Sequence, residues 1–478
     1  MIPTEWPILV AGAWMKTASR LDVRSPYDDA FIGHTYLGGP SELEQAVEGA
    51  VSARAEMAAL PAYKRAAILR HVASGLQRDR QAIAATLAAE AGKPLKDAES
   101  EVDRAALTMS ISADEALRLG GEMLPLDVGA PGAGRFAITK RVPAGPVAAI
   151  SPFNFPLNLV AHKLGPSIAA GNPIVLKPAT RTPLSALTLG RLFDEAGLPK
   201  GAMSVTPLGR ETGDRLVTDP RFKVLTFTGS SPVGWDLKAR AGKKRVILEL
   251  GGNAGAIVDR DADLDRAIPR LVAGAFTYAG QSCISVQRIF VHEDIADPLI
   301  KRLVAAVERL VVGNPLDPAT DVGSLIGPED AARVASWVDE AVTGGARLLT
   351  GGRRIGRAGY APTVLVDAPR TSKVCTEEAF APLVVIARVR SFDEAMLGIN
   401  DSSFGLQAGV FTNTLAHVLQ AFDQLEVGGV IINDVPAYRI DHMPYGGVKD
   451  SGLGREGPRY AIEEMTELRL LVLNQAVP

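Results

Sequence analysis

The chain has 478 residues, of which 47% are hydrophobic and 22% are charged. A chain of this length buries a large core and exceeds the usual size of one domain, so we expect two or three domains. Its formal net charge of -3 at pH 7 gives neither the basic footprint of a nucleic-acid-binding protein nor a polybasic membrane surface. We therefore expect a small molecule as partner, and no nucleic acid or membrane.

The two cysteines, Cys283 and Cys375, are too few for a disulfide framework and fit a reducing compartment. Residues 1–15 carry the acid Glu5 and no basic stretch, so they do not read as a secretory signal. The chain contains no uncharged apolar run of about 18 residues, so we predict no membrane span. We expect a cytoplasmic protein.

The first predicted element is a helical layer over 41–119, because Ala, Leu, Glu and Arg dominate there up to a stop at Gly120 and Gly121. Residues 135–142 then alternate apolar and polar side chains, which predicts a half-exposed strand. From Val147 the chain changes to a different rhythm.

Short β-branched runs alternate with helical windows from Val147 to Glu249, which predicts a doubly wound, mostly parallel sheet of Rossmann-like type. A second run of this kind begins near Gly251. The alternating segment 466–474 is left over after both sheets, and we expect it to pair with the strand at 135–142 in a small oligomerisation arm.

Cys283 follows a turn-like run, Tyr278 to Ser282. A catalytic thiol needs partial exposure, a nearby positive influence and an acceptor for its proton. A lone cysteine is more often buried and inert, and Cys375 keeps that interpretation. Whether Cys283 is catalytic or inert therefore has to be inferred from the other candidate residues that accompany it.

Asn154 lies in the segment Ser151–Pro156, directly after the apolar strand VAAI. A polar amide at the carboxyl end of a strand projects into the crevice where α/β sheets bind ligands. Its N–H groups could stabilise an oxyanion. The alternative is a turn-forming amide bonded to its own backbone.

Lys177 ends the buried run 174–177, so its charge is either aimed at a ligand or extended to solvent. The run Thr226–Gly234 links a strand to a helix, and its Gly229, Ser230 and Gly234 could place N–H groups and the helix dipole against a diphosphate. The alternative is a plain connection, since the run is not G-x-G-x-x-G.

Glu249 ends a strongly apolar strand, 246–249. Desolvation at such a position raises the pKa of a carboxyl, as a general base working near neutrality requires. The alternative, an ion-paired acid on an exposed face, fits the flanking leucines less well. The six histidines show no metal-ligand spacing, and we expect no metal.

Seven segments in order, together covering essentially the whole chain, resemble the aldehyde dehydrogenase superfamily, near the glyceraldehyde, lactaldehyde and phosphonoacetaldehyde dehydrogenases: FNFP, LKPA, FTGS, LELGG, GQSC, EEAFAP and PYGGVKDSG. The resemblance implies an α/β fold with two doubly wound domains and a small β arm. The expected division is a cofactor-binding domain over 1–119 and 141–250, a catalytic domain over 251–450, and an oligomerisation arm over 120–140 and 451–478.

By that resemblance Cys283 attacks an aldehyde, the resulting alkoxide is held by Asn154 and the Cys283 N–H, and Glu249 activates the water that hydrolyses the thioester. A coenzyme A-acylating relative is the nearest alternative, and Glu249 argues against it, since those enzymes generally lack this glutamate. A non-catalytic dinucleotide-binding protein on the same fold is a further alternative. The resemblance also implies a homodimer or homotetramer.

The cofactor implied is NADP or NAD. The residues that match the family's cofactor contacts are Ser151, Phe153, Lys177, Thr180, Arg181, Gly229, Ser230, Gly234, Glu378 and Phe380. Members that prefer NAD often carry an acid three residues after the lysine, where this chain has Thr180 followed by Arg181. A hydroxyl removes the repulsion of a 2′-phosphate and a guanidinium could pair with it, so we expect NADP to be accepted.

For the substrate, we expect a short polar aldehyde that is hydroxylated or carries one remote anion. Relatives that act on phosphorylated or phosphono aldehydes have an arginine before the cysteine and a histidine after the asparagine, where this chain has Ser282 and Phe155. The remaining candidates for contact with substrate are Arg104, Ile284 and Arg439. The alternative for Arg104 is a helix-surface ion pair with Glu101.

Overall fold

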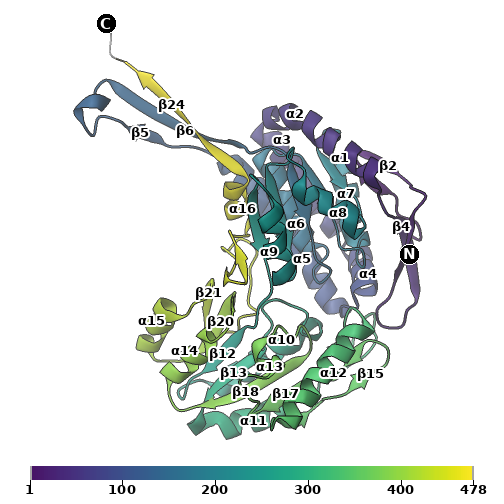
Figure 1. The fold of residues 1–478 in the computed structure, drawn as a ribbon, viewed down its shortest axis with the longest axis vertical. Coiled ribbons are helices and arrows are strands. Elements are labelled where there is room, and N and C mark those ends of the chain that lie inside the picture. Colours follow the sequence, from purple (N-terminus) through teal and green to yellow (C-terminus); the bar gives the residue numbers. More distant parts are fainter. Residues whose placement is uncertain (1–2, 476–478) are drawn as a thin grey trace.

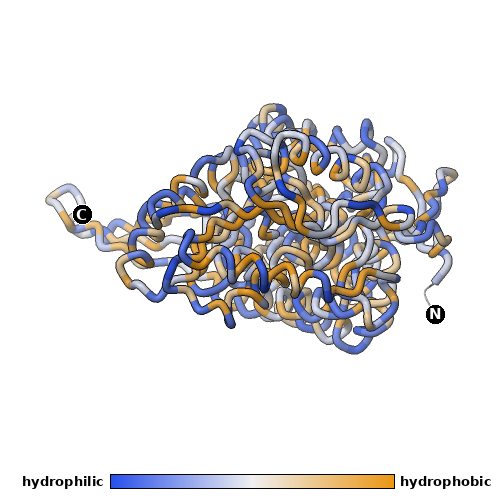
Figure 2. The backbone as a smooth tube through the Cα atoms, turned by 90° about the horizontal axis from the view of Figure 1, so that it is seen from below, coloured by the Kyte–Doolittle hydropathy of each residue, from blue (hydrophilic) through white to orange (hydrophobic). Residues whose placement is uncertain are grey.

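The computed structural model describes residues 3–475. It consists of two α/β domains, one above the other in Figure 1, and a thin β arm that extends from the upper one. This is the fold class that the sequence predicts, and it is confirmed. Hydrophobic stretches of backbone run through the middle of the molecule and hydrophilic stretches lie at its periphery (Figure 2).

The first domain is built on an eight-stranded sheet. Its strands, in spatial order, are β2 (Ala13–Met15), β1 (Ile8–Val10), β9 (Met203–Val205), β8 (Ile174–Lys177), β7 (Val147–Ile150), β10 (Val224–Thr228), β11 (Arg245–Glu249) and β23 (Gly452–Leu453). The five strands from β9 to β11 are mutually parallel. Their side chains are buried on both faces, as continuous β-branched runs require.

Helices cover both faces of this sheet. They are α1 (Pro40–Ser52), α2 (Arg54–Ala59), α3 (Ala62–Arg78), α4 (Arg80–Ala91), α5 (Leu95–Arg118), α6 (Asn158–Ala170), α7 (Leu184–Glu195), α8 (Arg210–Thr218), α9 (Ser231–Arg240) and α16 (Pro458–Glu464). One apolar cluster joins α3, α5, α6 and α7 to the sheet, and a second joins α1, α8 and α9 to its other face. The predicted helical layer over 41–119 is therefore five helices, broken for example by Pro61 and by the left-handed Gly92.

The second domain is built on a seven-stranded sheet. Its strands, in spatial order, are β14 (Arg347–Thr350), β17 (Thr363–Val366), β18 (Leu383–Val389), β13 (Arg288–His292), β12 (Gly255–Val258), β20 (Gln407–Phe411) and β21 (Gly429–Ile432). Its helices are α10 (Leu264–Phe276), α11 (Glu293–Val307), α12 (Pro328–Thr343), α13 (Lys373–Thr376), α14 (Phe392–Asn400) and α15 (Leu415–Gln424), with a 3₁₀ turn η2 (Thr277–Gly280). Two apolar clusters lie on opposite faces of the sheet.

The arm is a three-stranded sheet in the order β24 (Thr466–Asn474), β6 (Arg135–Pro143) and β5 (Met123–Pro125), with a 3₁₀ turn η1 (Ala130–Gly132) at its tip. The expected pairing of the two alternating segments is present: β24 and β6 are antiparallel over nine residues, from Thr466 opposite Pro143 to Asn474 opposite Arg135. The segment before β24 differs from expectation, because α16 packs on α5 and α6 and β23 pairs with β11, so both belong to the first domain.

Two short hairpins, β3 (Arg20–Arg24) with β4 (Phe31–Tyr36) and β15 (Arg354–Ile355) with β16 (Gly359–Tyr360), lie outside the main sheets. A third short antiparallel pair joins two strands that are distant in the chain, β19 (Phe404–Gly405) and β22 (Val448–Lys449). Within residues 3–475, no helix combines the length and apolar character needed to cross a bilayer.

Candidate active site

The loop that carries Cys283 is held in an unusual backbone conformation. Tyr278, Ala279 and Gly280 have φ angles of 49°, 53° and 68°, in the left-handed region that costs a residue with a side chain roughly 1–2 kcal/mol. A Cβ on Gly280 would lie 2.1 Å from the carbonyl oxygen of Ala381, so only glycine fits there. Such a turn persists only where surrounding packing imposes it, and it leaves the Cys283 side chain half-buried.

Two glycines after Glu249 let three loops come together. A Cβ on Gly252 would lie 2.2 Å from the carbonyl oxygen of Cys283, and a Cβ on Gly251 would lie 2.6 Å from a carboxylate oxygen of Glu378. The Gly252 N–H donates to Glu378 Oε1 at 2.9 Å. The glycines of LELGG thus allow close backbone approach between the end of the first sheet and the cysteine loop.

Asn154 lies in the loop between β7 and α6 and is 5% exposed. Its Nδ2 donates to the carbonyl oxygen of Gln281 at 3.0 Å, which ties the amide to the cysteine loop. A carboxamide has two N–H groups, so a second donor remains for a ligand. Asn154 and Cys283 are therefore joined through one turn of backbone.

A buried ion pair supports both loops. Lys93 and Glu101 are paired with fully buried side chains, and Glu101 Oε1 accepts from the N–H groups of Leu157 and Asn158 at the start of α6. Lys93 Nζ lies 3.7 Å from the ring centroid of Phe155 and 4.2 Å from that of Tyr278. One ammonium thus contacts the loop of Asn154 and the loop of Cys283.

Glu249 at the end of β11 is 3% exposed, and neither carboxylate oxygen has a hydrogen-bond partner within residues 3–475. Burial, and then the negative charge of Glu456, raises the pKa of Glu249 well above its usual range. Lys163 lies close by, 3.5 Å from Glu456, and donates to the hydroxyls of Thr226 and Thr228. An unpartnered buried carboxyl with a raised pKa suits a general base.

A model of the aldehyde dehydrogenase family matches residues 14–471. The chain belongs to this family. It is 46% identical over 472 residues to a 3-sulfolactaldehyde dehydrogenase of Priestia aryabhattai, covering 98% of each chain. It also resembles aldehyde dehydrogenase 21 of Physcomitrella patens, solved with the reaction product succinate, with a TM-score of 0.98 and 46% identity over 100% of this chain and 99% of the other.

A third relative is glyceraldehyde-3-phosphate dehydrogenase GapN of Methanocaldococcus jannaschii, solved with NADP. Its TM-score is 0.91 and it is 40% identical over 95% of this chain and 99% of its own. The expected enzyme class is thereby confirmed: the chain is an NAD(P)-dependent aldehyde dehydrogenase.

In this dehydrogenase three candidate cofactor residues lie at the carboxyl ends of strands of the first sheet: Ser151 after β7, Lys177 at the end of β8 and Ser230 after β10. The Lys177 side chain is partly buried, its ammonium has no hydrogen-bond partner within residues 3–475, and burial lowers the pKa of that ammonium. Ser230 is the N-cap of α9 and is exposed, whereas the hydroxyls of Ser151 and Ser231 are buried and unpartnered in the part of the chain described. Unsatisfied groups at the carboxyl ends of parallel strands and at a helix N-terminus fit a dinucleotide with its diphosphate.

The remaining cofactor candidates divide by location. A Cβ on Gly234 would lie 2.3 Å from Leu250, so this glycine serves close packing of α9 on the sheet. Glu378 has its pKa raised to about 7 by burial. Phe380, with φ of 49°, packs edge-on to Phe153 at 5.9 Å between centroids. Gly229 lies beside the Phe227 ring.

The two residues expected to decide between NAD and NADP are differently placed. Thr180 is half-buried. Arg181 is half-exposed and its guanidinium is already engaged: it donates to Glu329 and, at 2.8 Å, to the carbonyl oxygen of Ile326. To meet a phosphate, Arg181 has to exchange a carboxylate partner for it.

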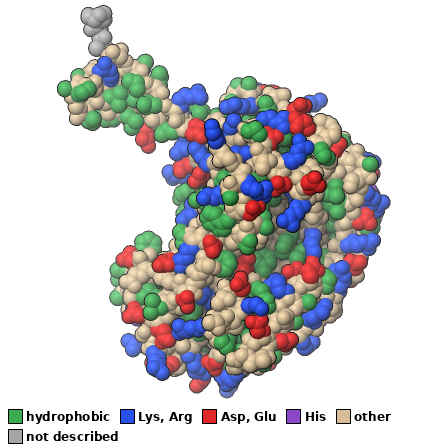
Figure 3. Space-filling view, viewed as in Figure 1, with side chains coloured by type: hydrophobic (Ala, Val, Ile, Leu, Met, Phe, Trp, Pro, Cys, Tyr) green, Lys and Arg blue, Asp and Glu red, His purple; other side chains and the backbone are tan. Residues whose placement is uncertain are grey.

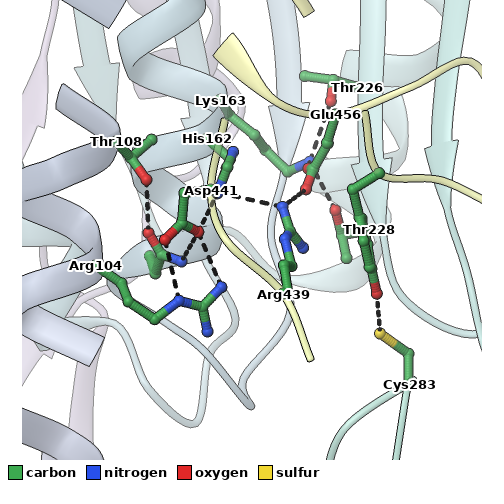
Figure 4. A network of polar contacts seen from close by, with 12 residues as sticks. Arg104, Thr108, His162, Lys163, Thr226, Thr228, Cys283, Arg439, Asp441 and Glu456 are labelled. Atoms are coloured by element: carbon green, nitrogen blue, oxygen red, sulfur yellow. Dashed lines mark hydrogen bonds and ion pairs between the residues drawn. The ribbon is translucent and has the colours of Figure 1, made fainter. Parts of the chain in front are cut away.

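The arginines expected to contact substrate belong to one polar network (Figure 4). Arg104 donates to Asp441 at 3.1 and 2.9 Å, so the alternative of a pair with Glu101 is not found. Its side chain is 27% exposed. The Arg439 side chain is only 6% exposed and its Nη2 donates to Glu456 at 3.1 Å. Arg104 is thus the more open of the two.

The other substrate candidates surround the thiol. Phe155 and Ser282 are half-buried, with Phe155 5.8 Å from the Arg104 guanidinium. Ile284 is 6% exposed and packs with Leu406 and Tyr445 beside Cys283. The sequence analysis did not single out three functional candidates: Tyr445, Lys163 and Glu456. Two of them could have been found as charges in unusual surroundings, Lys163 inside an apolar segment and Glu456 inside a glycine-rich one.

Proposed function

We propose that Cys283, Asn154 and Glu249 carry the aldehyde oxidation in this chain. The observation that supports this most directly is the way the LELGG segment brings them together: Glu249 ends β11, and three residues later Gly252 contacts the backbone of Cys283, to which Asn154 is linked through Gln281. The thiol, the amide donor and the unpartnered carboxyl therefore converge from three separate loops.

Cys283 Sγ forms a bond to the carbonyl carbon of the aldehyde, and the carbonyl oxygen becomes an alkoxide. That oxygen accepts hydrogen bonds from the second N–H of the Asn154 amide and from the Cys283 backbone N–H. A bound nicotinamide supplies the acceptor for the hydride that leaves the carbon. Glu249 then takes a proton from water, the water oxygen bonds to the thioester carbon, and the Cys283 thiolate leaves as the acid is released.

Two variants test this assignment. Cys283→Ala should abolish aldehyde-dependent reduction of the cofactor, because no covalent intermediate can form. Glu249→Gln should form the thioester and then stall, so that one equivalent of reduced cofactor appears rapidly and a mass increase equal to the acyl group persists on Cys283. Continued turnover in Cys283→Ala, or release of acid from Glu249→Gln at the rate of the native enzyme, would refute the assignment.

For the cofactor, we propose that Lys177 and Glu378 hold ribose hydroxyls and that Ser230 and Ser231 meet the diphosphate. The neutral Thr180 permits a 2′-phosphate, and the ammonium of Lys177, which has no partner in the described part of the chain, supplies a positive charge three residues before it, so NADP is accepted. Two relatives, 40% and 37% identical, were solved with NADP. A comparison of kcat/KM for the two cofactors tests this, and a strong preference for NAD would contradict it.

For the substrate, we propose a short aldehyde with a hydroxyl or one remote anionic group, met by Arg104. Arg104 Nη1 has no partner within residues 3–475, and the side chain is partly open beside Phe155, the neighbour of Asn154. Relatives are named for 3-sulfolactaldehyde, aspartate semialdehyde and lactaldehyde, all short and polar.

Arg104→Met tests the anion contact, because it keeps the aliphatic stem and removes the charge. We expect KM to rise severalfold or more for short anionic aldehydes and to change little for a neutral aldehyde of the same length. Equal effects on both substrates would contradict the contact.

We also propose that the arm joins copies of this chain into a homodimer or homotetramer. Apolar side chains are exposed on both faces of β24: Leu468 (61%) and Leu470 (55%) on one face, and Leu471 (54%) and Leu473 (42%) on the other. Hydrophobic side chains crowd the surface of the arm in Figure 3. A two-sided apolar ribbon this exposed indicates an interface. Leu470→Asp combined with Leu471→Asp should shift the mass in solution toward the monomer, measured by sedimentation.

A further inference from the structure

Tyr445 makes direct contact with the sulfur of Cys283. Its hydroxyl oxygen lies 2.9 Å from Sγ, within hydrogen-bond distance, and either atom can donate. The tyrosine is 2% exposed, and its ring packs with Ile284 and Leu406. This packing fixes the hydroxyl against the thiol.

Arg439 is stacked on the ring of the same tyrosine. Its guanidinium carbon lies 3.7 Å from the ring centroid, and its Nη2 is held by Glu456 and contacts His162 at 3.2 Å. Figure 4 shows this arginine between the histidine network on one side and Cys283 on the other. A cation on the face of a phenol draws electron density from the ring and strengthens the hydroxyl as a hydrogen-bond donor.

Four groups face the Cys283 thiol: Tyr445 and Arg439 from the loop between β21 and β22, and Glu249 and Glu378 from two other segments. Burial raises the pKa of the Cys283 thiol to about 12, the two glutamates add to that, and Tyr445 and Arg439 oppose it. Burial also raises the pKa of Tyr445 well above its usual range, so the phenol keeps its proton. Tyr445 and Arg439 are thus the two of the four neighbours that favour a thiolate.

We propose that Tyr445 is a catalytic residue whose hydroxyl donates a hydrogen bond to the Cys283 thiolate, and that Arg439 is a positioning residue that holds and polarises its ring. This rests on the proposed role of Cys283 as nucleophile. When Sγ bonds to the carbonyl carbon, the negative charge passes to the aldehyde oxygen and the hydrogen bond to sulfur weakens. Tyr445 therefore stabilises the nucleophile before the attack.

The test measures the thiolate without cofactor or substrate, as the rate of alkylation of Cys283 by neutral iodoacetamide between pH 7 and 9, located by peptide mass spectrometry. In this range the rate follows the thiolate fraction. Tyr445→Phe removes only the hydroxyl. A hydrogen bond to a charged group corresponds to about one unit of pKa, so alkylation should be about tenfold slower at each pH.

Tyr438→Phe is the matched control, since Tyr438 is 44% exposed and lies on the same segment. In Tyr438→Phe, Cys283 should be alkylated at the same rate as in the native enzyme. Arg439→Gln provides a second measurement that keeps the hydroxyl and removes the cation, and it should slow alkylation severalfold. Circular dichroism checks whether each variant is folded. If Tyr445→Phe does not fold, the alkylation rate of Arg439→Gln tests the proposal in its place.

The proposal is overturned if Cys283 in Tyr445→Phe is alkylated at the native rate. If Tyr445→Phe does not fold, the proposal is overturned when Cys283 in Arg439→Gln is alkylated at the native rate. Cys283→Ala separates this result from the larger one. If Cys283→Ala still oxidises aldehyde, the proposed function itself is wrong. If Cys283→Ala is inactive while Tyr445→Phe reacts like the native enzyme, only the role of Tyr445 fails.

Discussion

Gly252→Ala should disable the active site without unfolding the protein. The added Cβ would lie 2.2 Å from the carbonyl oxygen of Cys283, and real Cβ atoms almost never approach a heavy atom closer than 3.0 Å. The cysteine loop or the end of the sheet must therefore move by about 0.8 Å. A displacement near 1 Å of a reacting group costs on the order of 100-fold in rate.

The assay is kcat/KM for a short polar aldehyde, with the melting temperature measured in parallel. Gly209→Ala is the matched control, because a Cβ there meets nothing within 4 Å and the φ of −60° suits alanine. We expect about a 100-fold loss in Gly252→Ala and less than about a twofold change in Gly209→Ala. A Gly252→Ala enzyme as active as Gly209→Ala would refute the view that this contact positions Cys283.

Three further predictions concern Asn154, Glu378 and Lys93. Asn154→Ala should lower kcat about 100- to 1,000-fold by removing an oxyanion donor, measured in steady state; a loss confined to KM would contradict that role. Because the pKa of Glu378 is raised to about 7, its carboxylate form, the better acceptor for ribose hydroxyls, increases between pH 6 and 8. Cofactor affinity measured by titration should therefore rise over this range, and the rise should vanish in Glu378→Gln. Lys93→Met leaves Glu101 buried without its cation, which costs about 3–5 kcal/mol, so the melting temperature should fall by several degrees. Lys373→Met, which breaks a pair with half-exposed side chains, should cost less than about 1 kcal/mol, and similar effects of the two substitutions would contradict the importance of burial.

The alternation of strand and helix patterns was enough to predict both doubly wound domains and the pairing of β24 with β6. Each strand and helix shows itself through residues close together in the chain, whose periodicity indicates which face is buried. The pairing of β24 with β6 joins distant segments, and it was predicted because both alternate in this way and neither belongs to the two main sheets. The same local signals placed Glu249 at a strand end and Asn154 after another. The breaks between α1 and α5 were missed, because a single proline or left-handed glycine interrupts a pattern that is otherwise continuous.

The partners of the charged residues came only from the tertiary structure. Arg104 meets Asp441, 337 residues away, and Arg181 meets Glu329, 148 residues away. Sequence periodicity predicts neither pair, because it reports only on residues that are close together in the chain. A charged side chain pairs with the group that lies nearest in space, and that group can come from any part of the chain.

By itself, the sequence determined the family, the two-domain fold and the residue types needed for thioester chemistry. Only the folded chain decided which of them meet: Tyr445 reaches the sulfur of Cys283, Arg439 stacks on the tyrosine, and the Glu249 carboxyl has no hydrogen-bond partner among residues 3–475. The physical reason is that a pKa, a hydrogen bond or a steric contact depends on every group within a few ångströms, and packing brings those groups from distant parts of the chain.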